Sequence, residues 1–266
     1  MSGNIDREWR RFTPRQRILR FGVYLAVAVA FGLALRSIEI VPEFLTDTPT
    51  QVADLLVRMW PVDWGFLAST VIGAMVETIH IATLGTITTL AIALPIGVLA
   101  ARNIVTNPVV RFGAKLFLVA SRSVNSLVWA LFFVAVFGPG ALAGTVAITC
   151  RSIGFVGKLL GEALEEAAPG PVEAMTAVGA PWPSVFLKGY WPQVKPAFLS
   201  IALLRWDINV RESSVLGLVG AGGIGLVLDS AINVFHWRAV AAILVAILAI
   251  VLLAEVAVTA IRKRVL

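Results

Sequence analysis

Long runs of apolar residues constrain this chain more than any other feature of its sequence. Six of these runs reach or approach the roughly 20 residues that a helix needs to cross a bilayer core about 30 Å thick. They are residues 18–40, 76–100, 116–138, 141–163, 196–219 and 237–261. The pattern predicts an all-α polytopic membrane protein with about six transmembrane helices. The tight turn at residues 138–140 predicts that the third and fourth runs form a helical hairpin.

The composition agrees with this fold class. Hydrophobic residues make up 58% of the 266 residues and charged residues only 14%, against about 45–50% and about 25% in soluble domains. This balance excludes a soluble globular enzyme, a secreted disulfide scaffold and a disordered regulator. The single cysteine, Cys150, cannot form an internal disulfide.

The basic residues are distributed unevenly between the two sides of the predicted spans. Fifteen of the 22 Lys and Arg residues fall in the N-terminal segment, around the loops after the second and fourth spans, and at the C-terminus. Because short cytoplasmic loops are enriched in Lys and Arg, both termini are predicted to be cytoplasmic. The net charge of +6 therefore reflects topology and does not indicate a nucleic-acid partner.

The N-terminal segment admits two interpretations. Its basic residues and the following apolar run also occur in secretory signal peptides, but the run continues to Val41 without a small-residue cleavage region, which favours a retained anchor. Beyond it, residues 49–60 carry apolar side chains at helical spacing. This spacing predicts a helix that lies at the outer membrane interface.

Motifs for catalysis or cofactor binding are missing from the sequence. His80 and His236 lie far apart, and neither His-Glu-x-x-His nor Gly-x-Ser-x-Gly occurs. Residues 220–225 match Gly-x-Gly-x-x-Gly, but an apolar helix precedes them instead of a strand, so we interpret them as a helix break or a close backbone contact. No Walker loop is present, so any nucleotide must be hydrolysed by another chain. We predict a chain that is not an enzyme and has no cofactor or metal of its own.

The loop after the fourth span has a specific local pattern. Pro171 suits the first position of a short helix, Glu173 would then fall in its first turn, and Gly179 would end it in a left-handed conformation. A second short helix is predicted at residues 184–190, with Pro192 stopping it. Its apolar side chains would face the cytoplasm, and such a surface requires a partner.

This loop resembles the cytoplasmic "EAA" loop of ABC-importer permeases. Glu173, Ala174, Gly179 and Pro192 match the pattern of that loop, which docks into a cleft of the ATPase subunit. The departures from the pattern are Met175, Gly189 and Trp191.

Other segments, above all residues 211–225, resemble the membrane subunit of phosphonate-type ABC importers. The resemblance covers most of residues 70–262 and implies a binding-protein-dependent (type I) permease in the bacterial cytoplasmic membrane. It also implies a homodimer, two ATPase subunits that hold ATP and Mg, and an external substrate-binding protein. The transported substrate would be phosphonate, phosphite or phosphate.

We divide the chain on this basis. The predicted parts are a basic cytoplasmic N-terminus (1–17), a first span with an external interfacial segment (18–70), a permease core (71–262) with a coupling loop (167–192), and a basic C-terminus (263–266).

Charged residues within the apolar stretches are candidates for the transport pathway, because charges at membrane depth are unfavourable unless they are paired or hydrated. In the fifth stretch, the spacings 205–212 and 207–211 allow ion pairs between Arg205, Asp207, Arg211 and Glu212. Two interpretations remain open: these pairs are structural, or they help to pass an oxyanion.

A polar patch at residues 121–126 precedes the apolar core of the third stretch, and the guanidinium of its arginine matches the geometry of a phosphonate. We expect weak, transient contacts, with selectivity left to the binding protein. The pathway candidates are Arg122, Ser123, Asn125, Arg205, Asn209 and Arg211. Arg151 is the remaining arginine within an apolar stretch.

Small residues in the second span lie on one helical face. Thr78, Ala82, Gly85 and Thr89 recur at i, i+4, i+7 and i+11, which favours close helix packing, including a dimer seam, over a pore lining. Pro95 predicts a kink in the same helix.

The alternative function is an ion-gradient-driven secondary transporter or channel. It would require inverted repeats and unpaired intramembrane acids, and neither is visible in the sequence.

Overall fold

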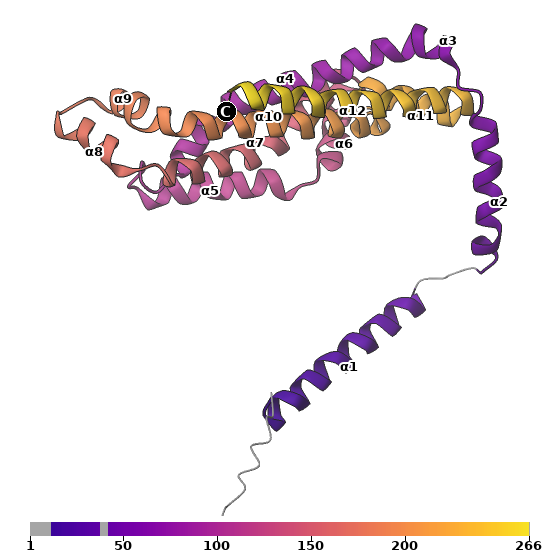
Figure 1. The fold of residues 1–266 in the computed structure, drawn as a ribbon, viewed down its shortest axis with the longest axis horizontal. Coiled ribbons are helices and arrows are strands. Elements are labelled where there is room, and N and C mark those ends of the chain that lie inside the picture. The colour runs from indigo at the N-terminus through magenta and orange to yellow at the C-terminus, as the bar shows by residue number, and fades with distance from the viewer. Residues whose placement is uncertain (1–11, 38–41, 266) are drawn as a thin grey trace, which may run out of the picture. The chain divides into compact units, whose positions relative to one another are not determined.

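The computed structural model describes residues 12–37 and 42–265, and its long elements are helices, which confirms the predicted fold class. The chain divides into two compact units, of which the first ends at Asp54 and the second begins at Leu55 (Figure 1). Residues 1–11 with the basic Arg7, Arg10 and Arg11, residues 38–41 at the end of the predicted first span, and residue 266 lie outside the described part.

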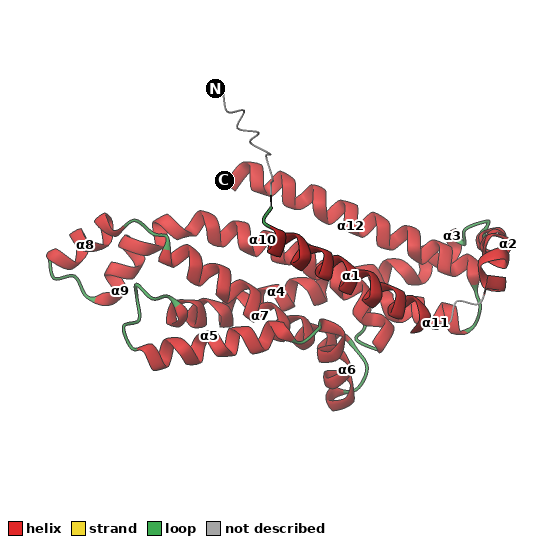
Figure 2. Cartoon of the chain, turned by 90° about the horizontal axis from the view of Figure 1, so that it is seen from below, coloured by secondary structure: helices red, strands yellow, loops and turns green. Residues whose placement is uncertain are grey.

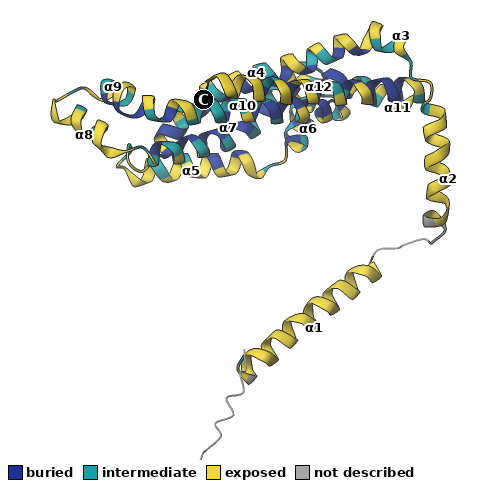
Figure 3. Ribbon diagram, viewed as in Figure 1, coloured by how far each residue is buried: buried dark blue, intermediate teal, exposed yellow. Residues whose placement is uncertain are grey.

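The first unit contains α1 (Pro14–Ser37) and most of α2 (Pro42–Met59). The apolar stretch of α1 is long enough to cross a membrane, and its residues are exposed (Figure 3). An exposed apolar helix of this length is stable in lipid, as expected for a first span. Helix α2 covers residues 49–59 of the helix predicted at residues 49–60 and begins seven residues earlier.

The second unit is a bundle of long helices with short helices at its two ends (Figure 2). The longer helices are α4 (Ile72–Ala100), α5 (Pro108–Ser123), α6 (Ser126–Phe137), α7 (Ala141–Glu165), α10 (Trp191–Leu216) and α12 (Trp237–Val265). The shorter ones are α3 (Trp64–Phe66), α8 (Pro169–Ala177), α9 (Trp182–Val185) and α11 (Gly223–Asn233). In both views α8 and α9 lie at one end, and α3 and α11 at the other.

Helix α7 is the centre of this bundle and packs against α4, α5, α6 and α10. Small residues let α4 and α7 approach closely: a Cβ atom on Gly85 would lie 3.0 Å from Ile148 Cγ2, and one on Gly97 would lie 3.0 Å from the carbonyl oxygen of Gly157. Packing of this kind favours helix association in membranes, where the hydrophobic effect is absent. Gly157 and Gly161 of α7 therefore lie at the contact with α4.

The second span is longer than predicted. Helix α3, a π-helical turn (Leu67–Val71) and α4 form one continuous helical run from Trp64 to Ala100, 37 residues long. Helix α4 continues through Pro95 without a break.

The third span is not the single helix predicted at residues 116–138. Helices α5 and α6 meet at Val124 and Asn125 with a bend of 87°. Val124 and Asn125 both have extended backbone angles. The Asn125 side chain accepts a hydrogen bond from the N–H group of Leu127 and so caps the start of a new helix, α6. Within the described residues, five helices can cross a membrane, or six if this bent pair counts as one span.

The glycine-rich segment at residues 220–225 breaks the helix after α10, as predicted. Gly220, Gly222 and Gly223 have φ values of +85°, +82° and +68°, which favour glycine. The chain then forms α11, a helix that the sequence did not predict. The Ile224 N–H group donates to Thr78 Oγ1 at 2.8 Å, so α4 satisfies part of the exposed backbone.

The loop after α7 differs from its prediction in two details. Helix α8 begins at Pro169, so Glu173 lies beyond its first turn. Pro192 does not stop a helix, because a π-helical turn (Phe186–Tyr190) continues directly into α10 and places this proline in the first turn. A π-helical turn shifts the hydrogen-bond register and so accommodates a residue without an N–H donor.

The close contact between α5 and α7 generates a prediction about stability. A Cβ atom on Gly154 would overlap the backbone carbonyl oxygen of Leu118 and lie 2.9 Å from the backbone nitrogen of Arg122. We expect Gly154→Ala to lower the free energy of unfolding by about 1–3 kcal/mol, because backbone atoms cannot move aside. Thermal unfolding in detergent measures this, with Gly113→Ala on α5 as the control, since a Cβ there meets nothing within 4 Å. Equal unfolding midpoints for both variants would contradict the packing described here.

Candidate functional site

Arg205 is a buried charge near the middle of α10. Its Nε atom donates to Ser152 Oγ of α7 at 2.8 Å, and its Nη2 atom lies 3.2 Å from Glu212 Oε2. Glu212 forms a second ion pair with Arg151 of α7. The spacing of residues 205 and 212 predicts the first pair, whereas the second joins helices that are distant in sequence. Two arginines thus share one carboxylate, which leaves one positive charge in excess.

Asp207 and Arg211 form the other ion pair that the spacing predicts, at i and i+4 of α10. Asp207 is buried, and its Oδ1 atom has no hydrogen-bond partner within the described residues. The side chain of Arg211 is about half exposed. This pair therefore connects the interior of the bundle to its surface.

Asn209 has no exposed surface and lies between three helices. Its Nδ2 atom donates to Thr86 Oγ1 of α4 at 2.8 Å, and its Oδ1 atom accepts from Ser152 Oγ of α7 at 3.2 Å. In this structure the Asn209 side chain connects α4, α7 and α10 through these hydrogen bonds, and its place in the pathway stays a prediction.

A pocket of about 390 Å³, which we call the mid-helix pocket, lies between α5, α7 and α10. Its lining residues are Val119, Arg122, Ser123, Arg151, Phe155 and Arg205. Three arginines from three helices meet around this space. Guanidinium groups donate pairs of hydrogen bonds in a fixed fork, which matches the oxygen geometry of phosphate-like anions.

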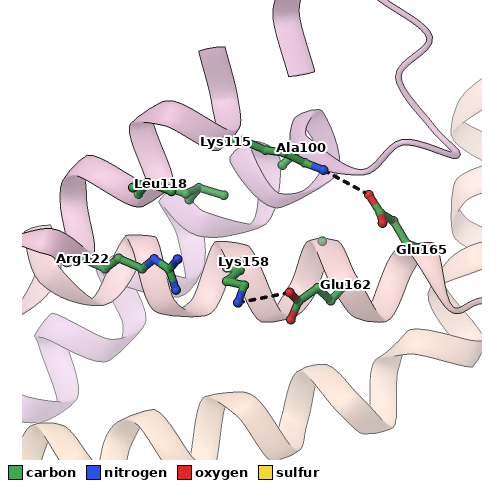
Figure 4. Close-up of a pocket in the computed structure, with 9 residues that line it drawn as sticks. Ala100, Lys115, Leu118, Arg122, Lys158, Glu162 and Glu165 are labelled. Carbon is green, nitrogen blue, oxygen red and sulfur yellow. Dashed lines mark ion pairs between the residues drawn. The ribbon is translucent and has the colours of Figure 1, made fainter. Parts of the chain in front are cut away.

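A second pocket, of about 210 Å³, adjoins the first along α5 and α7, and we call it the helix-end pocket. Its lining residues are Ala100, Lys115, Leu118, Val119, Arg122, Lys158, Gly161, Glu162 and Glu165. Figure 4 shows Lys158 paired with Glu162 and Lys115 paired with Glu165, at 3.3 and 3.6 Å. Val119 and Arg122 line both pockets.

The structure brings together Arg122, Ser123 and Arg205 of the predicted pathway and places the other candidates elsewhere. Asn125 lies at the bend between α5 and α6 and caps α6. Arg211 lines neither pocket.

Three basic residues of the pockets were missing from the predicted pathway: Arg151, Lys115 and Lys158. In the sequence, the two lysines indicate only the cytoplasmic side of the spans. A signal for them exists in the sequence, because Arg151, Phe155 and Lys158 recur at i, i+4 and i+7 and so share one face of α7.

The predicted small-residue stripe lies inside the bundle of one chain. Thr78 and Thr89 have no exposed surface, and Gly85 faces Ile148 of α7. Thr78 also accepts the hydrogen bond from Ile224 described above. In this structure the stripe packs α4 within its own chain, and the dimer seam stays a prediction.

The predicted coupling loop forms an exposed corner at one end of the bundle (Figure 1). Glu173 and Ala174 are exposed on α8, and Pro192 is exposed at the start of α10. Gly179 has a φ of +73° and follows the end of α8, as predicted. Large apolar side chains also remain exposed here: Val178, Trp182 and Leu187.

The inner side of the same loop packs against the ends of α4 and α7. An apolar cluster joins the loop to these helices through Val98, Leu160, Leu164, Val185, Tyr190 and Val194. A Cβ atom on Gly189 would lie 3.3 Å from Val172 Cα, which explains a glycine at this position of the motif. Side-chain packing therefore connects this loop to α4, α7 and α10.

Residues 93–266 match the family model described as "Binding-protein-dependent transport system inner membrane component". The chain belongs to this family. The phosphite transport system permease protein PtxC of Stutzerimonas stutzeri is 37% identical over 267 residues, which cover 96% of each chain. The phosphate-import permease protein PhnE of Mycolicibacterium smegmatis is 35% identical over 237 residues, which are 89% of this chain and 44% of that relative. The chain thus spans less than half the length of that relative.

A solved structure supports the same assignment. The permease fold of the inward-facing MetNI methionine ABC transporter superposes with a TM-score of 0.65 and 25% identity, and covers 74% of this chain and 96% of that chain. The predicted importer-permease architecture is confirmed. As a binding-protein-dependent permease, the chain is a multi-pass inner-membrane transport subunit and not an enzyme, and its family implies an ATPase and a binding protein as partners.

The Glu212 carboxylate, which Arg151 and Arg205 share, generates a second prediction about this permease. Glu212→Gln leaves Arg205 buried without a counter-ion, so we expect the free energy of unfolding to fall by about 3–5 kcal/mol. Thermal unfolding in detergent measures the change. Glu166→Gln, which removes an exposed carboxylate with no ion pair among the described residues, is the matched control. A Glu212→Gln midpoint equal to that of the control would show that the network does not stabilise the bundle.

Proposed function

We propose that the chain is the membrane subunit of an ATP-driven importer that passes a phosphorus oxyanion, namely phosphonate, phosphite or phosphate, across the bacterial cytoplasmic membrane. The observation that carries this proposal is the 37% identity with a phosphite transport permease over nearly the full length of both chains. The basic mid-helix pocket supports it, because its arginines match the chemistry shared by these anions.

The importer contains two copies of this chain, two ATPase subunits that hold ATP and Mg, and an external binding protein. The coupling loop (167–192) is the surface on which an ATPase docks. Its exposed apolar side chains and the exposed Glu173 support this role, since such a surface at the end of a membrane bundle indicates a protein partner. The basic residues at this end favour the cytoplasmic side, with both chain termini on the same side.

Transport proceeds by alternating access in this proposal. Closure of the two ATPases on ATP moves the paired coupling loops, and the apolar cluster beneath each loop passes the movement to α4, α7 and α10. Substrate selectivity lies mainly with the binding protein, because a permease that held the anion tightly would release it slowly.

Reconstitution tests the proposed function directly. The tagged chain is expected to co-purify with an ABC ATPase and, in proteoliposomes with the binding protein, to take up radiolabelled phosphite or phosphate when ATP is supplied. Uptake that requires an ion gradient and no ATP would support a secondary transporter instead. Absence of any co-purifying ATPase would refute the importer assignment.

The coupling loop generates a third prediction. Gly179→Val forces a β-branched residue to a φ of +73°, and Glu173→Ala removes an exposed carboxylate of α8. We expect each substitution to lower ATP-driven uptake about tenfold or more while ATP hydrolysis continues, because the loop transmits the movement.

The matched control for both variants is Gly170→Ala, since a Cβ there meets nothing within 4 Å and Gly170 has no positive φ. Uptake and hydrolysis are measured on the same reconstituted complexes. Normal ATPase binding and transport in both coupling-loop variants would disprove this role of the loop.

A further inference from the structure

The mid-helix and helix-end pockets follow one face of α7 and one face of α5. Arg151, Phe155 and Lys158 line them from α7, while Lys115 and Arg122 line them from α5. Val119 and Arg122 line both pockets, so the two pockets are neighbours. We call the two pockets together the groove, and basic groups line it from both helices.

The depth of this groove follows from the positions of its residues along the helices. Arg151 lies 10 residues after the start of α7 and 14 before its end, or about 15 and 21 Å at 1.5 Å per residue. Arg205 lies 14 residues after the start of α10 and 11 before its end. The mid-helix pocket therefore lies halfway along both helices. Lys158 lies about 10 Å nearer to the end of α7, towards the coupling loop.

The groove has more positive than negative charge. Three arginines line the mid-helix pocket, and the one acid paired with them is Glu212. Lys115, Arg122 and Lys158 line the helix-end pocket together with Glu162 and Glu165. Unbalanced positive charge at membrane depth is unfavourable. A bound anion would compensate for it.

Arg122 differs from the other cations of the groove. Arg151 and Arg205 share Glu212, Lys158 pairs with Glu162, and Lys115 pairs with Glu165. Arg122 has no ion-pair partner among residues 12–37 and 42–265 and is exposed. Its guanidinium and that of Arg151 line the same pocket and are available to one anion.

We propose that this groove is the intramembrane path of the phosphorus oxyanion, with Arg122 as the residue that passes the anion from the mid-helix pocket to the helix-end pocket. The proposal rests on the proposed function of the chain. In the mid-helix pocket the anion is held by Arg122 and Arg151, with the Ser123 hydroxyl beside them. It then moves with Arg122 towards Lys158 and leaves at the coupling-loop end.

The paired acids explain why the anion does not remain bound. Glu212 competes with the anion for Arg151 and Arg205, and Glu162 competes for Lys158. Each step exchanges one anionic partner of a cation for another, so the binding at every position is weak. Weak binding at several sites is what conduction of an ion requires.

Substitution of Arg122 tests the groove, because this residue makes no described ion pair whose loss would unfold the bundle. In proteoliposomes with the complete importer, we expect Arg122→Gln to lower the maximal uptake rate of radiolabelled phosphite and inorganic phosphate about tenfold, the effect of losing one charge-assisted hydrogen bond. Arg122→Lys, which keeps the charge, should recover part of the rate. Lys158→Gln should also lower it.

The matched control is Arg111→Gln, which removes the same charge from the same helix outside both pockets. Uptake by this variant should equal that of the unmodified chain. ATPase co-purification and the thermal unfolding midpoint should be unchanged in all four variants. A loss of uptake that accompanies loss of the ATPase or a lowered midpoint would assign Arg122 a structural role and overturn the proposal.

The outcomes separate this inference from the proposed function. If the unmodified importer takes up neither anion, the proposed function fails. If it transports them and both Arg122→Gln and Lys158→Gln transport at the rate of Arg111→Gln, the permease assignment stands and the groove is not the path.

Discussion

The Ser152 hydroxyl lies at the polar centre on which the geometry of the bundle depends. It accepts a hydrogen bond from Arg205 and donates one to Asn209, which in turn donates to Thr86, so α4, α7 and α10 are joined at one level. In a membrane, an unsatisfied polar group is unfavourable by several kcal/mol, and no water is present to replace a lost partner. A one-residue shift of any of the three helices would break these bonds. The network therefore fixes the helix register, and the register positions the arginines of the mid-helix pocket.

Helix α4 connects the two ends of the bundle. At the coupling-loop end, Val98 belongs to the apolar cluster that includes Tyr190, and at the opposite end Thr78 accepts a hydrogen bond from the first turn of α11. Gly85 near the middle of α4 and Gly97 near its end both pack closely against α7. Helix interfaces that are this densely packed do not deform continuously. They move between discrete arrangements. Helix α4 therefore links the packing of the coupling loop to that of the glycine-rich break at the far end.

Sequence patterns predicted the features of this chain that depend on local chemistry. Apolar length located most spans, the spacing 205–212 predicted an ion pair, and the residue type at Gly179 predicted its backbone conformation. The apolar run 116–138 has the length of one span, so it does not reveal the break between α5 and α6, where the Asn125 side chain caps α6. The ion pair of Arg151 with Glu212 depends on the packing of helices that are distant in sequence, and so does the place of Arg122 beside Arg151 in one pocket. Local periodicity does not encode such contacts.

The arrangement of acids explains how a permease can contain arginines at membrane depth and still release its substrate. Arg205 is held on one side by Glu212 and lies 5.6 Å from the ring centroid of Phe155, so its position is fixed before any anion arrives. A fixed cation needs little reorganisation to bind an anion, and the competing carboxylate limits how tightly it does so. In the proposed path, the same pairing that makes the charge tolerable in the membrane would also keep the affinity for an anion low. Because this limit would act on any anion of similar charge, we expect the groove to supply passage and the binding protein to discriminate among phosphorus oxyanions.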